Sequence, residues 1–268
     1  MSFSVIEPTV NETPVIVEVP HAGLGMDAQS LAYCTAPGRS IGQDADLLVS
    51  ELFAHAPKTG AHLIYSHLSR YVCDLNRAED DFDQHTSPCG RSHSAPHGVV
   101  WRKTTDGRPA LSAPLSSQEI ERRLNLIYRP YHLALYDLIQ EKRKKFGFVV
   151  ILCGHSMPSF GRLGERRADL VPGSRGRTTA HPSVLDCCDR VAAQARYDVA
   201  HDSPYRGGFT TGHYGLPASN IHALQLELAR RIYMDESTLC SISERFDACK
   251  VFCTELVTEL GKLRLIDV

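Results

Sequence analysis

The chain has 268 residues, of which 43% are hydrophobic and 22% are charged, and its formal net charge is −2. These values are typical of a globular protein long enough to bury one large core or two small ones. The near-neutral charge gives no electrostatic reason to expect nucleic acid or an anionic membrane as a partner. No basic leader and no apolar run of about 18–20 residues is seen, so we expect a soluble, cytoplasmic protein.

The nine cysteines are spread along the chain and form no CxxC pair. A zinc ribbon or a thioredoxin-type motif is therefore not expected. Free thiols in a reducing compartment are the simplest interpretation, and most of them should be small, buried apolar residues.

Short apolar runs alternate with helical patterns along the chain. Strands are predicted at 14–20, 62–65, 71–75, 148–152 and 221–227, and helices at 44–53, 117–145, 182–196 and 235–262. Residues 79–114 are rich in Asp, Ser, His, Gly and Pro and predict a long irregular insertion, a feature that is often functional. The alternation favours a single α/β domain over residues 1–268, with a mostly parallel or mixed sheet.

The predicted helix at 117–145 carries its own boundary signals. Ser116 or Ser117 is expected to cap its N-terminus, and the basic residues at 142–145 suit its C-terminal end. Pro130 is expected to kink it.

Titratable side chains stand where three predicted strands end. The strand at 14–20 leads into His21, the strand at 148–152 leads into His155, and the strand at 221–227 ends in Glu227. Open α/β sheets bind ligands at the carboxyl ends of their strands. Two histidines and spare carboxylates there suggest a divalent metal with an open coordination position, although a lone histidine at a strand end is more often a polar end-group.

The third metal ligand is expected from Asp44 or Asp46, at the start of the predicted helix at 44–53. Two histidines and one carboxylate, with water in the fourth place, form the usual catalytic zinc set. Residues two apart on a helix face different ways, so at most one carboxylate should reach the metal, while the other caps the helix or orients a ligand histidine. Alternatively, both acids only complement the helix dipole, and the sequence does not choose between these interpretations.

Glu227 and the pair Asn76 and Arg77 are the other candidates for chemistry. Burial among apolar neighbours raises the pKa of a carboxylate, which suits Glu227 to the role of general base unless a neighbouring arginine neutralises it. Asn76 and Arg77 follow a predicted strand and can grip a substrate carboxylate through the guanidinium fork and the amide. The competing interpretation of this pair is a surface turn with an ion pair.

Three further features carry weaker signals. The glycine-rich stretch at 205–215 lacks the spacing of a phosphate-binding loop and is expected to form a loop close to the substrate. Ser156 lies outside a GxSxG elbow, which disfavours a serine nucleophile. Cys153 lies in a buried apolar strand and is expected to be inert, although its position near His155 keeps a thiol nucleophile as an alternative.

These motifs resemble those of the N-formylglutamate amidohydrolases, which have an α/β fold of the zinc carboxypeptidase and aspartoacylase type. The similar segments span most of the chain in order, and together they are specific at the level of the family. They lie at 19–23, 44–46, 69–77, 98–102, 128–132, 154–158, 167–173, 207–215, 223–228 and 233–236. The resemblance implies a three-layer α/β/α architecture.

The same resemblance implies a hydrolase of N-acyl amino acids, most directly of N-formyl-L-glutamate, that holds one Zn²⁺ or another divalent metal per chain. The small-molecule substrate is the expected partner, and the oligomeric state is left open. The implied metal ligands are His21, one of Asp44 and Asp46, and His155, and the implied catalytic residue is Glu227. Asn76 and Arg77 look like the pair that holds the substrate α-carboxylate. The weaker candidates for the side-chain carboxylate or the oxyanion are Arg70, Arg102 and His213.

One departure from the family pattern lies two positions before His155, where an acid is expected as the partner of the ligand histidine. This chain has Cys153 there, so either another acid orients His155 or the site is retuned. Three alternative functions stay open. They are hydrolysis of other N-acyl amino acids, a metal-independent thiol or serine hydrolase, and a relative that binds an amino acid without catalysis.

Overall fold

The computed structural model describes residues 2–90 and 96–265. The chain divides into two compact units. The first comprises Met1–Ser4, Pro20–Leu47 and Tyr65–Tyr136, and the second comprises Val5–Val19, Leu48–Ile64 and Asp137–Val268.

A six-stranded sheet has the strand order β1-β3-β2-β4-β6-β5. Its central strands β2, β4 and β6 are parallel, while β5 runs antiparallel to β6, and all four belong to the second unit. These strands are buried along their whole length because both of their faces are mostly apolar, as is typical of strands covered on two sides. The predicted α/β class with a mixed sheet is confirmed. The strands are β1 (Phe3–Ile6), β2 (Val15–Val19), β3 (His62–Ser66), β4 (Val149–Met157), β5 (Leu170–Gly173) and β6 (Ile221–Ala229).

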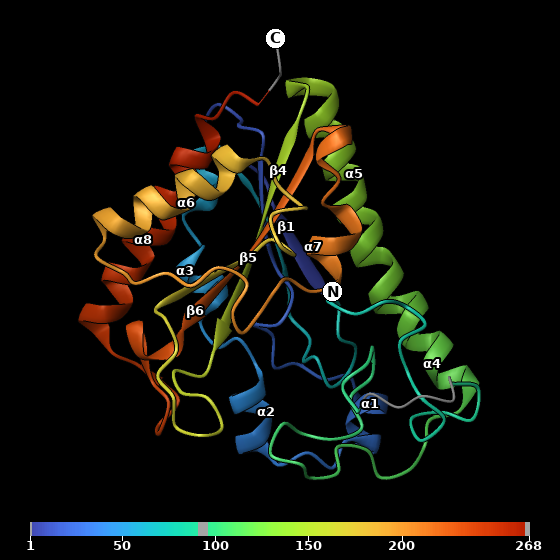
Figure 1. Cartoon of the computed structure of the whole chain (residues 1–268). Coiled ribbons are helices and arrows are strands. Elements are labelled where there is room, and N and C mark those ends of the chain that lie inside the picture. The colour runs from blue at the N-terminus through green and yellow to red at the C-terminus, as the bar shows by residue number, and fades with distance from the viewer. Residues whose placement is uncertain (1, 91–95, 266–268) are drawn as a thin grey trace. The chain divides into compact units, whose positions relative to one another are not determined.

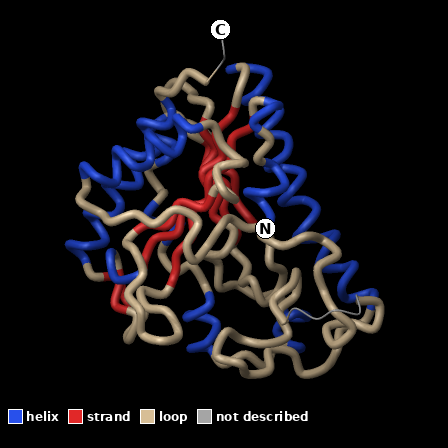
Figure 2. Tube along the Cα trace, viewed as in Figure 1, coloured by secondary structure: helices blue, strands red, loops and turns tan. Residues whose placement is uncertain are grey.

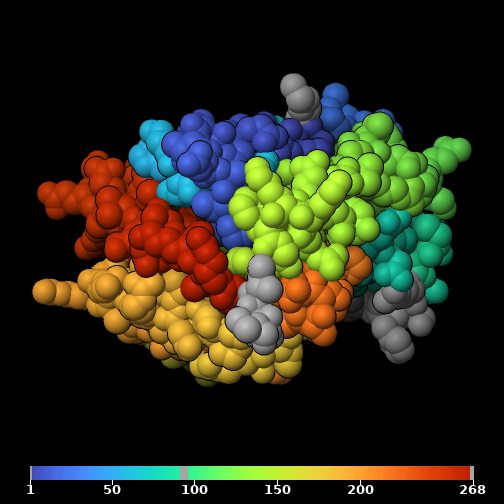
Figure 3. Space-filling view, turned by 90° about the horizontal axis from the view of Figure 1, so that it is seen from above, coloured from blue at the N-terminus to red at the C-terminus, as the bar shows by residue number. Residues whose placement is uncertain are grey.

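Helices cover both faces of the sheet within the second unit (Figure 1). On one face lie α3 (Val49–Leu52), α6 (Pro182–Gln194) and α8 (Ser243–Gly261), and α6 and α8 are side by side at the surface in Figure 3. On the other face lie α7 (Phe209–Tyr214) and the part of α5 (Arg129–Phe146) that belongs to this unit. This unit therefore has the three α/β/α layers that the resemblance implied.

The first unit is mostly irregular. It contains α1 (Ala28–Tyr33), α2 (Gly38–Asp44), α4 (Ser117–Arg123), the π-helical turn η2 (Leu124–Tyr128) and the start of α5. Between residues 79 and 114 the described part has isolated bridges but no helix or strand, as predicted, and Figure 2 shows these loops in tan. Residues 91–95 lie outside the described ranges.

Two predicted elements in the first third of the chain are wrong. The expected strand at 71–75 is a turn, because the backbone N–H of Val72 bonds to the carbonyl of Ser69 at 2.8 Å instead of joining a ladder. The expected helix at 44–53 is two helices, since α2 ends at Asp44, and Leu48 adopts a left-handed conformation (φ 67°) before α3 begins. The acids at 44 and 46 therefore do not head a helix.

The long predicted helix at 117–145 is interrupted by η2. Ser116 caps α4 by accepting a hydrogen bond from the backbone N–H of Glu119, as expected. The π-helical turn ends just before Pro130, whose missing N–H leaves the regular helical ladder one donor short.

The C-terminal prediction is partly wrong, because β7 (Met234–Asp235) pairs with β8 (Cys240–Ser241) before α8 begins at Ser243. The remaining short elements are 3₁₀ turns at η1 (Ala56–Thr59), η3 (Pro217–Ser219) and η4 (Arg230–Ile232). Within the described ranges, every helix is too short or too polar to cross a membrane.

Candidate active site

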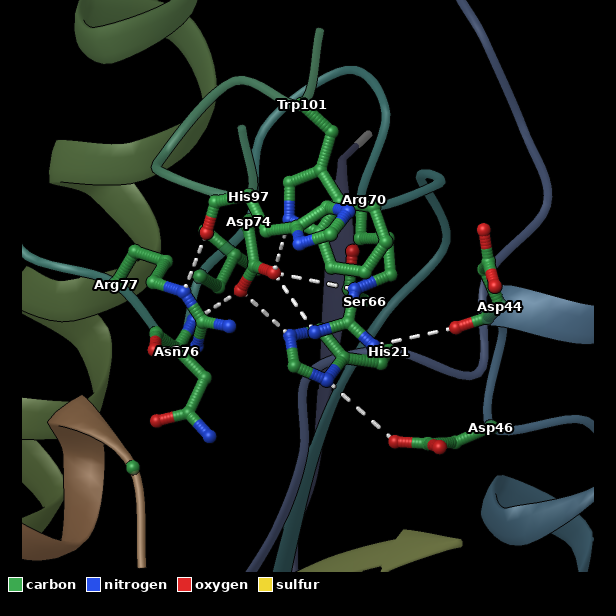
Figure 4. A network of polar contacts seen from close by, with 12 residues as sticks. His21, Asp44, Asp46, Ser66, Arg70, Asp74, Asn76, Arg77, His97 and Trp101 are labelled. Carbon is green, nitrogen blue, oxygen red and sulfur yellow. Dashed lines mark hydrogen bonds and ion pairs between the residues drawn. The ribbon is translucent and has the colours of Figure 1, made fainter. Parts of the chain in front are cut away.

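In the first unit, His21 is fixed between two carboxylates (Figure 4). Its Nε2 atom lies 2.7 Å from Oδ1 of Asp74, and its Nδ1 atom lies 3.4 Å from Oδ2 of Asp46. All three side chains are buried. The shorter contact places a ring proton on Nε2, toward Asp74, so the Nδ1 lone pair stands beside Asp46. An imidazole nitrogen next to a carboxylate oxygen is a pair of donors suited to zinc.

Asp74 is the centre of this network and is fully buried. Its Oδ1 accepts a hydrogen bond from the backbone N–H of Asn76 at 2.9 Å, and its Oδ2 accepts from Arg70 Nη2 at 2.8 Å and Trp101 Nε1 at 2.9 Å. Burial favours the neutral acid, but Arg70 and His21 hold the pKa of Asp74 well below its usual range. Asp74 therefore stays a carboxylate and keeps His21 in one tautomer. No role was predicted for it, because its partners are far away in the sequence.

The electrostatics of His21 fit a bound cation. Burial and Arg70 lower the pKa of His21, but Asp74 and Asp46 outweigh them, and the net effect is a raised pKa. The negative surroundings that stabilise a proton on this ring also stabilise a metal ion. The residue types present in the first unit therefore fit a divalent metal.

The structure places Asp44 and Asp46 in different surroundings. The carboxylate of Asp44 accepts hydrogen bonds from the Tyr71 hydroxyl and from both the backbone N–H (3.1 Å) and the hydroxyl of Thr105. It ties the end of α2 to the irregular segment. Asp46 instead lies in the link after α2, and its backbone N–H donates to the carbonyl of His21 at 3.0 Å. This pairing favours Asp46 as the metal ligand.

Asn76 and Arg77 lie next to this network and are held in place by the backbone. Arg77 donates from Nε to the carbonyl of His97 at 2.8 Å and from Nη1 to the carbonyl of Asn76 at 2.9 Å. Asn76 is buried, which disfavours the surface-turn interpretation. The Asp74 carboxylate thus positions both a candidate metal ligand and the candidate carboxylate-binding pair.

In the second unit, His155 on β4 lies opposite Glu227 on β6 in the parallel register, and both are buried. Strand β4 runs on to Met157, so His155 lies within the strand and not after its end as predicted. Strand β6 runs on to Ala229, two residues beyond the strand end predicted at Glu227. Strand geometry alone therefore brings an imidazole and a carboxylate together.

Glu227 has a defined partner on its own strand. Gln225 donates from Nε2 to Oε1 of Glu227 at 2.8 Å, while its Oε1 accepts from the backbone N–H of Gly208 at 2.8 Å. Arg230, a possible neutralising neighbour, donates from Nε to the hydroxyl of Ser156 at 3.2 Å. The raised pKa expected for Glu227 stays a prediction.

An acid from the neighbouring strand stands beside Cys153. The register of β2 and β4 pairs Glu18 with Cys153. Burial, reinforced by the charge of Glu18, raises the pKa of Cys153 well above its ordinary value. A thiol that stays protonated is a poor nucleophile, so the thiol-hydrolase alternative is disfavoured.

The three weaker candidates for substrate binding contact other side chains of the protein. Arg70 pairs with Asp74, and in the same unit Arg102 Nε donates to Asp83 Oδ2 at 2.9 Å. His213 on α7 stacks on Phe209, with ring centroids 4.7 Å apart. The substrate roles of Arg70, Arg102 and His213 stay predictions.

Comparison with known proteins decides the family. A family model described as N-formylglutamate amidohydrolase matches residues 13–234. The chain belongs to the N-formylglutamate amidohydrolase family. It is 31% identical over 229 residues to the N-formylglutamate deformylase of Pseudomonas putida, covering 84% of this chain and 83% of that protein. The N-formylglutamate deformylase of Pseudomonas aeruginosa PAO1 is 30% identical over 228 residues, with 83% of each chain covered.

Solved structures agree with this membership. The N-formylglutamate amidohydrolase of Ralstonia eutropha JMP134 aligns over 97% of both chains with a TM-score of 0.89 and 28% identity. A gene product of Agrobacterium tumefaciens aligns over 97% of this chain and 94% of its own with a TM-score of 0.67, and at 19% identity it supports the fold alone. The family member described here is thus a hydrolase acting on amide bonds, as the sequence predicted.

Proposed function

We propose that this amidohydrolase removes the formyl group from N-formyl-L-glutamate, with water, to give formate and L-glutamate. The names of its relatives support the substrate. The observation that carries the proposal is the buried Asp74–His21–Asp46 arrangement, in which one carboxylate fixes the imidazole and the other stands beside its second nitrogen.

We further propose that His21, Asp46 and His155 bind one divalent metal, zinc by preference. Two imidazoles and one carboxylate, all buried, are the donor set of catalytic zinc sites, which keep a further position open. A metal in such a site lends Lewis acidity to a carbonyl oxygen and lowers the pKa of water.

The chain's own groups then have distinct tasks. Asn76 and Arg77 bind the α-carboxylate, which orients the formamide before reaction. Glu227 accepts a proton from the attacking water and returns it to the leaving amine, and Gln225 holds its carboxylate for both transfers. These are the roles of a hydrolase, and a protein that only binds an amino acid has no need of a positioned base.

We also propose a cytoplasmic location. All nine cysteines are free thiols, four of them within α6 and α8. Free thiols persist where the compartment is reducing.

The test measures metal content by plasma mass spectrometry together with glutamate release from N-formyl-L-glutamate, before and after chelation and after zinc is returned. We expect about one metal per chain, loss of turnover on chelation and its recovery with zinc. N-acetyl-L-glutamate is the matched control for acyl size. Faster release from that substrate would move the assignment to longer acyl groups. Turnover that ignores chelation would contradict the metal.

A further inference from the structure

The loop after β5 presents an arginine whose role is not yet assigned. β5 runs antiparallel to β6 and pairs Gly173 with Gln225, so Arg175 lies two residues beyond the row that holds the partner of Glu227. The loop is pinned from both sides. Asp202 accepts hydrogen bonds from the backbone N–H groups of Ser174 at 2.7 Å and Gly176 at 2.9 Å, and the N–H of Arg175 donates to the carbonyl of Arg206 at 2.7 Å.

Arg175 adopts a left-handed backbone conformation, with φ at 53°. This conformation is costly for a residue with a Cβ atom and persists only where the surroundings enforce it. Here the pinned loop enforces it and aims the side chain at the glycine-rich stretch.

The side chain of Arg175 packs against glycines of that stretch. A Cβ atom on Gly212 would lie 2.0 Å from Nη1 and 2.8 Å from Cζ of Arg175, and one on Gly207 would lie 3.3 Å from its Cγ. All three atoms nearest the Gly212 position belong to Arg175. Gly212 therefore leaves room for this side chain, whereas the nearest atoms to the Gly207 position belong to Thr211.

The charge of Arg175 is not neutralised within the described residues. Its side chain is exposed, its one hydrogen bond there runs from Nη1 to the carbonyl of Gly208 at 3.5 Å, and no carboxylate of those residues pairs with it. Arg70 and Arg102, by contrast, form ion pairs with Asp74 and Asp83. The guanidinium group of Arg175 is thus available to an anionic ligand.

A short chain of bonds links Arg175 to Glu227. The backbone carbonyl of Gly208 accepts a hydrogen bond from Arg175, and the backbone N–H of Gly208 donates to the side chain of Gln225. Gln225 in turn donates to Glu227. Arg175 and the partner of the proposed base thus both bond to the backbone of Gly208.

We propose that Arg175 binds the side-chain carboxylate of the substrate and so sets the preference for acidic over neutral N-formyl amino acids. This inference rests on the proposed function and names the residue that selects the substrate class. A guanidinium matches a carboxylate through two parallel hydrogen bonds, whereas the neutral amide of glutamine offers it one acceptor oxygen.

The test compares kcat/KM for N-formyl-L-glutamate with kcat/KM for N-formyl-L-glutamine, which has nearly the same shape but no charge. We expect Arg175→Ala to lower this ratio by about 100-fold, and Arg175→Lys, which keeps the charge but not the fork, by about 10-fold. Gly212→Ala should lower it as well, because the new methyl group takes the place of Nη1. That variant should fold, since alanine favours a helix and the displaced atoms are the flexible end of one side chain.

Arg177→Ala is the matched control, because Arg177 is also exposed and also has a left-handed backbone (φ 63°) two residues away. Its ratio should equal that of the wild type. An unchanged ratio in Arg175→Ala, or the same fall in Arg177→Ala, would overturn the role of Arg175 while the deformylase assignment stands. A wild type that hydrolyses neither substrate would overturn the proposed function and this inference with it.

Discussion

The candidate residues of the two units are held in place by different physical interactions. In the second unit, His155 and Glu227 face each other because the hydrogen-bonded ladder of β4 and β6 puts them there. In the first unit, His21 and Asp46 lie on irregular backbone, and a buried carboxylate, Asp74, fixes the imidazole through charged hydrogen bonds. A ladder tolerates side-chain changes, whereas a buried charge network fails when one member is lost. The effects of a single substitution should therefore reach more of the neighbouring residues in the first unit than in the second.

The largest effect is expected from Glu227→Gln. The change removes the proposed base but leaves the ladder intact, so kcat should fall by about 10³- to 10⁴-fold while metal content and the free energy of unfolding stay near the wild type. Kinetics with N-formyl-L-glutamate, paired with metal analysis and urea unfolding, provide the check. Turnover close to that of the wild type would remove Glu227 from the base role.

Substitutions of Asp46 and Asp44 in the first unit should differ sharply in their effect on zinc affinity. Asp46→Ala removes a proposed ligand, and its loss of zinc affinity should exceed the roughly 10- to 100-fold cost of removing an outer partner. Asp44→Asn should keep its zinc, because that carboxylate bonds to Tyr71 and Thr105. Zinc titration of both apoproteins makes the comparison, and loss of affinity in Asp44→Asn alone would reverse the assignment.

Asp74→Asn tests whether the network is as fragile as its burial suggests. It leaves the partly buried Arg70 without its carboxylate and His21 without its anchor, so we expect about 10- to 100-fold weaker zinc binding and a loss of about 3 kcal/mol in the free energy of unfolding. Unfolding of the metal-free protein isolates the second effect from the first. Wild-type stability and affinity together would show that the network does not position the ligand.

A milder effect is expected when a positioning residue on the ladder is changed. Gln225→Met keeps the length of the side chain but removes the hydrogen bond to Glu227, so kcat should fall by about 10-fold with KM almost unchanged. A rise in KM alone would instead place Gln225 in substrate binding.

The smallest effect is expected at Cys153. Cys153→Ser keeps a small side chain opposite Glu18 and removes only a thiol whose raised pKa makes it unreactive. Most of the activity should remain. Complete loss in a folded, metal-loaded variant would revive the thiol alternative.

The same contrast explains which residues of the candidate site could be predicted from the sequence. His155 and Glu227 follow from apolar strand patterns, because a strand fixes where its side chains point. Asp74 was missed because its partner His21 is 53 residues away, and no local pattern reveals such a bond. The strand predicted at 71–75 failed for a related reason. Its β-branched and aromatic residues suit a strand, but its backbone closes a turn on Ser69, and the N–H of Asp74 bonds to the carbonyl of Val99.

The position of Arg175 shows the same limit. Its sequence neighbours predict only a loop, and the glycines that seat it lie more than 30 residues further along the chain. The glycine-rich stretch was expected to lie near the substrate, yet which side chain it accommodates depends on tertiary packing. The long apolar strands of the sheet are thus predictable from sequence, whereas contacts between distant loop residues are not.

The most direct test of the account is anomalous scattering at the zinc absorption edge from crystals of the zinc-loaded protein. We predict one strong peak per chain, bonded to Nδ1 of His21, a carboxylate oxygen of Asp46 and a nitrogen of His155, with Nε2 of His21 still on Asp74. A peak bonded to other residues, or zinc on Nε2 of His21, would contradict the account.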